Sequence, residues 1–218
     1  MKPISLVLAT ISLLAGSVLA AAPAVAQTHD WSGFYAGVQA GWFNGTGTLT
    51  EPGGGEIGSW NLTGPFAGKY AGFNVQNGNF VYGVEGDINL ARISGESSGV
   101  VQVVYEYGSE IETLGSLRGR AGFATGNALF FGTAGLAFAT GCYWYEYDGP
   151  YEMEELSHLG FVVGVGAEYA LSDSISFRKE IRFYSFPGQE VVLGEEPTDL
   201  VDYALSGVTA SVGLTFHF

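Results

Sequence analysis

Apolar and polar side chains alternate with a period of two residues along much of this chain. The alternation is clearest in four segments, where apolar residues take every second position: 80–90, 158–171, 175–186 and 206–218. Four further segments have similar lengths and a weaker alternation: 33–42, 66–76, 113–124 and 129–140. A period of two is typical of β-strands whose two faces meet different environments. The pattern predicts an all-β protein with eight strands.

The connections between these segments alternate in length. Three are short turns, at 77–79, 125–128 and 172–174, and four are long, at 43–65, 91–112, 141–157 and 187–205. The predicted strands have about the 9 to 11 residues that a tilted strand needs to cross a bilayer. Short turns at one end and long loops at the other are typical of outer-membrane barrels. We therefore predict an eight-stranded antiparallel up-and-down transmembrane β-barrel.

Charged residues on the polar face distinguish this barrel from a soluble sandwich. The predicted inward set holds four acids and four bases: Glu85, Asp87, Glu168 and Glu180 with Arg118, Arg120, Arg178 and Arg182. An enclosed lumen needs such a balance, because an unpaired buried charge is costly and arginine pairs well with carboxylates. A water-facing surface would not need it. Lys179 departs from the pattern, since its parity places it on the lipid face, where we expect it to lie near an interface.

The first residues of the chain predict export. Residues 1–26 begin with Lys2, continue through an apolar run and end in the small residues Ala24-Val25-Ala26, which is the pattern of a cleaved secretory signal peptide. Residues 27–218 would then form one barrel domain in the outer membrane. The net charge of −14 argues against nucleic acid as a partner, because the phosphate backbone would be repelled.

The sequence offers no recognisable catalytic or metal site. The three histidines, His29, His158 and His217, lie in different segments without neighbours at ligand spacing. The single cysteine, Cys142, allows no intrachain disulfide. His158 and Glu168 share a face but lack a nucleophile between them, so the triad needed for hydrolysis is missing. We expect no enzymatic activity, no metal and no cofactor.

Several segments resemble a family of small outer-membrane β-barrels common in alphaproteobacteria, related to the membrane domain of OmpA-type proteins. The segments that carry the resemblance are Asp30–Gly37, Tyr82–Asp87, Gly115–Gly122 and the final Phe216-His217-Phe218. The resemblance implies an envelope constituent, a surface antigen or a weak porin. It also implies that Phe216 and Phe218 form the signal read by the barrel-assembly machinery.

The long connections leave two interpretations open. One carries the aromatic residues Tyr143, Trp144, Tyr145, Tyr147 and Tyr151, which could bind a host receptor or haem, or could simply continue two strands above the membrane with an aromatic girdle. The long connections also hold 16 of the 22 acidic residues. These acids could chelate cations that bridge lipopolysaccharide phosphates, or only keep the loops solvated.

Three functions therefore remain open at the level of sequence. The first is a structural role in the envelope, in contact with outer-membrane lipid and lipopolysaccharide. The second is a porin of low conductance, which the paired charges would oppose, because eight strands leave an interior just wide enough for side chains. The third is a loop-borne adhesin or haem-binding protein.

Overall fold

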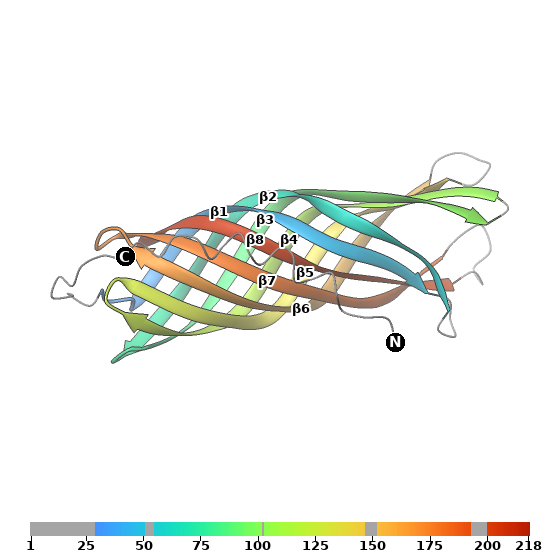
Figure 1. The fold of residues 1–218 in the computed structure, drawn as a ribbon. Helices are drawn as coiled ribbons and strands as arrows, with labels where there is room; N and C mark the ends of the chain where they lie inside the picture. Colours follow the sequence, from blue (N-terminus) through green and yellow to red (C-terminus); the bar gives the residue numbers. More distant parts are fainter. Residues whose placement is uncertain (1–28, 51–54, 102, 147–151, 193–199) are drawn as a thin grey trace.

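The chain folds into one closed antiparallel sheet in the computed structural model, which describes residues 29–50, 55–101, 103–146, 152–192 and 200–218. The barrel has eight strands, in the order of the sequence: β1 (Gly33–Thr50), β2 (Glu56–Asn77), β3 (Phe80–Val101), β4 (Val103–Thr125), β5 (Ala128–Glu146), β6 (Glu152–Ala170), β7 (Ile175–Val192) and β8 (Leu200–His217). Each strand pairs with the next, and β1 pairs with β8 to close the barrel (Figure 1). The predicted fold class is confirmed.

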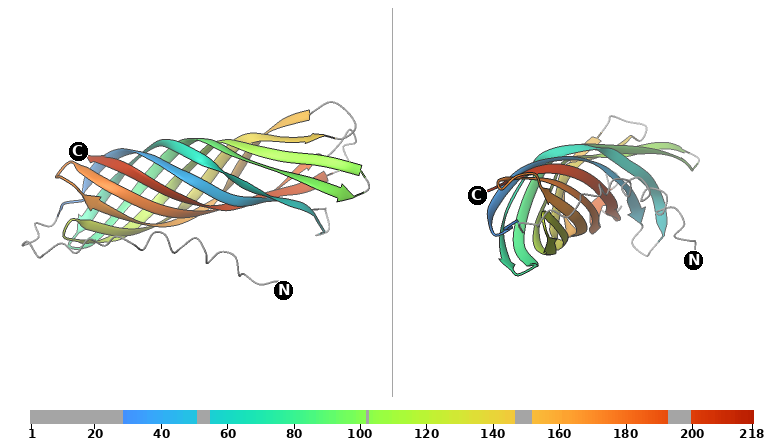
Figure 2. Two further views of the ribbon diagram at one scale, coloured as in Figure 1. Left: turned by 45° about the horizontal axis from the view of Figure 1, so that its top comes forward. Right: turned by 60° about the vertical axis from the view of Figure 1, so that its left-hand side comes forward.

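Tight turns join the strands at one end of the barrel. Gly78 and Gly126 lie in two of these turns with φ values of 60° and 58°. Glycine adopts this left-handed conformation without steric cost, so both turns reverse the chain within two residues. The C-terminus lies at this same end (Figure 2). In the described part of the chain, no helix is long and apolar enough to span a membrane.

The strands are longer than the sequence pattern predicted. They contain 18 to 23 residues, and they include most of the segments that we expected to be long loops. β1, for example, continues beyond the predicted end at residue 42 to Thr50. A tilted strand needs only about 9 to 11 residues to cross the bilayer, so each strand extends well beyond it.

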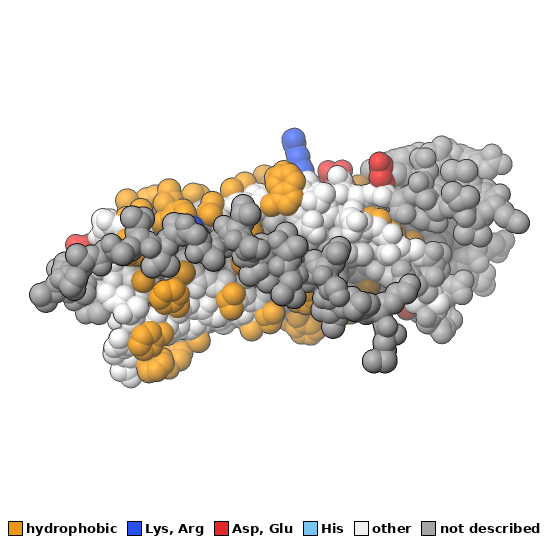
Figure 3. All heavy atoms as spheres, viewed as in Figure 1, with side chains coloured by type: hydrophobic (Ala, Val, Ile, Leu, Met, Phe, Trp, Pro, Cys, Tyr) orange, Lys and Arg blue, Asp and Glu red, His pale blue; other side chains and the backbone are white. Residues whose placement is uncertain are grey.

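The outer surface divides into an apolar band and a polar extension. The band begins at the short-turn end, where exposed aromatic residues gather: Phe34, Phe73, Phe80, Phe123, Phe130, Tyr169 and Phe216. It ends at a second ring of apolar residues that includes Trp42, Leu90, Phe138, Leu159 and Phe183. The next outward positions are polar: Asn44, Arg92, Thr140, Ser157 and Ser185. Hydrophobic side chains accordingly cluster over one part of the barrel in Figure 3. This arrangement matches the apolar band, about 25 Å tall, of transmembrane barrels.

Lys179 lies on the outer face, as its parity predicts. It is four positions from the start of β7, in the half of the band nearer the short turns. Its Nζ atom lies 5.7 Å from the centre of the Phe177 ring, which is closer to the strand's beginning. The side chain therefore reaches toward the nearer membrane surface, as a lysine on a lipid-facing strand is expected to do.

Side chains fill the barrel in three layers. Near the short turns lies a small apolar cluster: Trp31, Val81, Ala124, Leu129, Phe131 and Ala170. The middle layer holds the charged residues. Above it lies a larger apolar cluster that includes Phe43, Leu49, Trp60, Leu62, Phe66, Ile93, Leu114, Tyr184, Phe186 and Tyr203. The fifth strand, apolar on both faces in sequence, contributes Leu129 and Phe131 to the lower cluster and Ala137 and Ala139 to the upper one.

Candidate functional site

The middle layer of the lumen contains all eight charged residues of the predicted inward set. They come from four strands: Glu85 and Asp87 from β3, Arg118 and Arg120 from β4, Glu168 from β6, and Arg178, Glu180 and Arg182 from β7. Every one of them is buried. The period of two that places them on one face of each strand also aims them at a common axis. We call this set the lumen network.

Glu85 is the centre of the lumen network. Arg178 holds it with two hydrogen bonds, from Nη1 to Oε2 at 2.5 Å and from Nη2 to Oε1 at 2.9 Å. Arg118 also donates a hydrogen bond to Glu85, and the hydroxyl of Tyr35 donates another at 2.8 Å. A buried carboxylate needs several donors to offset the loss of water, and Glu85 has them.

Glu180 joins three of the four arginines. Arg118 donates to its Oε1 at 2.6 Å, and Arg178 donates to its Oε2 at 2.9 Å. Arg182 lies within 3.3 Å of the same carboxylate. Thr133 of β5 adds a hydrogen bond to Oε1 at 3.1 Å. Three strands, β4, β5 and β7, are thereby connected around a single side chain.

The remaining members attach at the two ends of the lumen network. On the side of the short turns, Arg120 donates to Glu168 at 2.5 Å and stacks its guanidinium 3.9 Å from the centre of the Phe131 ring. On the opposite side, Arg182 donates to Asp87 at 3.2 Å and to Gln39 at 2.8 Å. The neutral side chains of Phe131 and Gln39 therefore contact arginines at the two ends of the network, in addition to the carboxylates.

The lumen network and the apolar clusters fill the lumen. Four carboxylates and four guanidinium groups cancel in charge and are closed above and below by apolar clusters. An ion crossing the barrel would have to displace charge-assisted hydrogen bonds whose partners would then be left unpaired in a site of low dielectric constant. The geometry is that of a packed core of paired charges between two apolar layers.

A short segment before β1 closes the lumen at the short-turn end, which the sequence analysis did not foresee. Trp31 is fully buried, and its backbone N–H donates to Oε1 of Gln76 at 2.8 Å. The ring of His29 lies edge-on to it, with centroids 4.5 Å apart. Burial and the neighbouring His217 lower the pKa of His29. We call residues 29–32 the floor segment; a tryptophan directly before the first strand was the signal that could have indicated it.

Hydrogen bonds to Ser32 stabilise the turn of the floor segment. The backbone N–H of Ser32 donates to the carboxylate of Asp30 at 2.9 Å. This hydrogen bond and one to the Ser32 side chain lower the pKa of Asp30. The Ser32 hydroxyl in turn accepts a hydrogen bond from the backbone N–H of Gln76 at 3.1 Å. The floor segment is thus bound to the end of β2.

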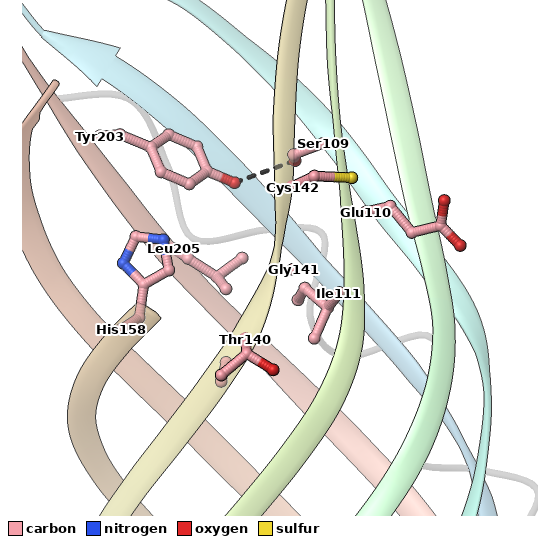
Figure 4. A pocket seen from close by; sticks show the side chains of 10 residues that line it. Ser109, Glu110, Ile111, Thr140, Gly141, Cys142, His158, Tyr203 and Leu205 are labelled. Atoms are coloured by element: carbon pink, nitrogen blue, oxygen red, sulfur yellow. Dashed lines mark hydrogen bonds between the residues drawn. The ribbon is translucent and has the colours of Figure 1, made fainter. Parts of the chain in front are cut away.

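Aromatic side chains close the lumen at the other end. The rings of Trp60 and Tyr203 stack with centroids 5.5 Å apart and planes 8° from parallel. Trp60 Nε1 donates to the hydroxyl of Ser109 at 3.1 Å, and Ser109 also shares a hydrogen bond with the Tyr203 hydroxyl at 3.0 Å. His158 lies 5.3 Å from the Tyr203 ring. A small cavity is lined by Ser109, His158 and Tyr203, together with neighbouring residues of β4, β5 and β8 (Figure 4).

His217 lacks the arrangement of a catalytic triad. His217 Nε2 lies 2.9 Å from the Ser176 hydroxyl and 3.5 Å from Glu168, so one nitrogen faces both groups. A catalytic triad would need the carboxylate at the other ring nitrogen. The described residues also contain no group of three or more His, Cys, Asp or Glu side chains placed to bind a metal.

Those of the remaining predicted site residues that the structure describes lie at the two ends of the barrel. Phe216 and Phe218 are exposed at the short-turn end. Three of the loop aromatics, Tyr143, Trp144 and Tyr145, lie in β5 and pair in register with β6, while their side chains fall outside the description. The other two, Tyr147 and Tyr151, lie outside the described residues. The strands do continue here, and the binding role stays a prediction.

A closed barrel with an apolar outer band and a charge-paired interior defines an outer-membrane β-barrel protein. Residues 11–218 match the model of the outer membrane protein beta-barrel domain family, and the chain belongs to this family. It is 32% identical over 167 residues to a 22 kDa outer membrane protein of Rhizobium leguminosarum bv. viciae, covering 76% of this chain and 69% of the relative. The protein is located in the outer membrane.

Other relatives and solved structures agree with this assignment. The chain is 30% identical over 164 residues to a 25 kDa outer-membrane immunogenic protein of Brucella abortus, covering 74% of this chain and 68% of the relative. The barrel is similar to the outer membrane protein OprG of Pseudomonas aeruginosa, with a TM-score of 0.58, 11% identity and coverage of 88% of this chain and 99% of OprG. At this identity the likeness shows the fold alone.

Proposed function

We propose that this protein is a structural constituent of the outer membrane that supports envelope integrity, exposes its long strands at the cell surface and has no enzymatic activity. One observation carries the proposal: the lumen is filled along its length by the floor segment, the lumen network and the upper apolar cluster. A sealed barrel cannot serve as an open channel, so its contribution to the membrane lies in its walls and its exposed ends.

The names of the relatives support surface exposure. The Brucella relatives are called immunogenic outer-membrane proteins, and a protein reaches antibodies through the parts that project from the cell. The strands of this chain extend beyond the apolar band with polar outward residues, which is consistent with such a projection. The same surface is the place where the adhesin or haem-binding alternative would have to act.

Two measurements together test the proposal. The first compares sensitivity to detergent and to EDTA in a strain that lacks the gene and in the same strain carrying the gene again. We expect the deletion to raise sensitivity and the restored gene to reverse it. The second records single-channel currents of refolded protein in planar bilayers, with folding checked by heat-modifiable gel mobility. Steady openings from a folded sample, or an unchanged deletion strain, would contradict the proposal.

A further inference from the structure

The hydrogen-bonded ladder between β6 and β7 stops well before these strands end. Its last pair is Phe161 with Ser185, although β6 begins at Glu152 and β7 continues to Val192. Beyond that pair, β6 remains paired with β5, and β7 remains paired with β8. Among the described residues, each of the two strands therefore has one unpaired edge above the apolar band.

A second ladder stops in the same way. The pairing of β2 with β3 ends at Thr63 and Ser94, although β2 begins at Glu56 and β3 continues to Val101. The other six ladders reach the ends of their strands or nearly so. The barrel wall above the membrane thus consists of two lobes, one of β7, β8, β1 and β2 and one of β3 to β6, whose ends diverge in Figure 1.

The two lobes contact each other through side chains inside the barrel. Trp60 and Tyr203 of the first lobe both hydrogen-bond to Ser109 of the second. Phe186 of the first lobe lies 6.2 Å from the ring of His158 of the second. The interior is therefore closed by side chains although the strand edges are not joined.

The unpaired edge of β6, residues 152–159, combines free backbone hydrogen-bonding groups with an acidic sequence. A free strand edge presents backbone N–H and C=O groups that another extended chain can pair with. This edge contains Glu152, Glu154 and Glu155, and Glu190 lies in the facing part of β7. The segments 141–160 and 186–205 contain no lysine or arginine. A second copy of the same edge would bring acid against acid, which disfavours pairing between copies.

We propose that the free edge of β6 is a binding site for an extended cationic peptide, which adds to the sheet as an extra strand. The backbone of β6 supplies the hydrogen bonds, and the acidic, lysine- and arginine-free sequence of this segment favours a cationic strand over an acidic one. Cross-strand pairs of opposite charge stabilise a β-sheet, and acidic residues on a free edge exclude copies of the same chain. The site lies directly above the apolar band, where Leu159 is the last outward apolar residue of β6.

The test uses the full chain refolded in a zwitterionic detergent. The probe is a labelled peptide of alternating lysine and valine, eight residues long, and the control is the same peptide with every backbone amide N-methylated. We expect the first peptide to bind and to slow amide hydrogen exchange in residues 152–159. The methylated peptide keeps the charge but cannot donate backbone hydrogen bonds, so we expect it not to bind.

Two charge-reversed variants separate strand addition from general attraction. Glu152, Glu154 and Glu155 are replaced by lysine in one, and Glu106, Glu110 and Glu112 of β4 in the other, which changes the net charge equally on a strand with no free edge. We expect the first variant to lose affinity about tenfold or more and the second to lose far less. Equal losses, equal binding of the methylated peptide, or protection only outside 152–159 would overturn the proposal.

Discussion

Arg178 reaches from one wall of the barrel to the opposite wall and binds Glu85 with both of its terminal nitrogens, at 2.5 and 2.9 Å. The two residues belong to β7 and β3, which are four strands apart in a closed barrel of eight. The pair therefore joins opposite walls, and strand pairing alone would not do so. This bond makes the lumen network a tertiary core in a protein whose apolar surface faces lipid.

The lumen network predicts a large asymmetry between inward and outward charge reversals. Replacing Arg118 with glutamate leaves Glu85 and Glu180 facing a third buried carboxylate. We expect a loss of about 3 to 5 kcal/mol or more in the free energy of unfolding. Glu112→Lys, at an exposed position, should change it by less than about 1 kcal/mol. Urea titrations read by heat-modifiable gel mobility measure both, and equal losses would mean that the network does not stabilise the barrel.

The floor segment predicts a second loss of stability at the short-turn end. Trp31→Ala removes a fully buried indole from the lower apolar cluster, which we expect to cost about 3 to 5 kcal/mol. Trp42→Ala is the matched control, because Trp42 is exposed on the outer band. In detergent its replacement should cost clearly less. If both variants unfold at the same urea concentration, the floor segment does not contribute to the core.

The pKa of His29 predicts that docking of the floor segment depends on pH. A lowered pKa means that the docked segment favours the neutral ring, so docking is strongest above the ordinary value of 6.5. It weakens as the pH falls below 6.5 toward the lowered pKa. We expect the NMR signal of the Trp31 backbone amide to shift between about pH 7 and pH 5. His29→Gln should remove most of this shift; a shift that persists would assign it to other groups.

The terminal aromatic residues predict a defect in assembly and not in stability. Phe218 is 83% exposed, so Phe218→Ala removes few internal contacts. We expect the purified variant to unfold within about 0.5 kcal/mol of the parent protein, while its level in the outer membrane of cells falls. Phe80→Ala, another exposed aromatic at the same end, is the control and should assemble normally. Normal assembly of both would argue against a terminal signal.

Substitution of two glycines, Gly166 on an inward face and Gly132 on an outward face, is predicted to affect stability differently. A Cβ atom at Gly166 would lie 2.4 Å from the Phe131 ring, while one at Gly132 would meet only a carbonyl oxygen at 3.8 Å. Gly166→Ala should therefore destabilise the barrel by about 1 to 3 kcal/mol, and Gly132→Ala should be close to neutral. Thermal unfolding of the two variants compares them directly, and similar melting temperatures would show that the lumen adapts easily at this layer.

The alternation of the sequence was enough to predict the barrel, the number of strands and the faces of the charged residues. It underestimated the strands for a physical reason. Within the bilayer the outward positions are apolar, but above it the outward positions are polar and the inward ones apolar, so the pattern changes phase. The neighbours Trp42 and Phe43 mark this change, since the first faces out and the second faces in. When outward positions are assumed to stay apolar along the whole strand, the residues after Phe43 do not fit the pattern and are assigned to a loop.

The lumen partners could not be read from the sequence in the same way. Parity places Arg178 and Glu85 on inward faces, but the choice of partner depends on shear and on which side chains of opposite walls meet at one height. The closure by Trp60, Ser109 and Tyr203 was missed because these residues lie in the segments taken as loops. Trp31 was missed because it precedes the first strand.

The filled lumen also has a consequence for the permeability of the outer membrane. Open pores are limited in number, because each one adds to the leakage of small solutes and toxic compounds through the outer membrane. On the structural role proposed above, a barrel filled by paired arginines and carboxylates would add no such leak. A bacterium could then carry many copies of this protein in its outer membrane without raising the permeability of that membrane.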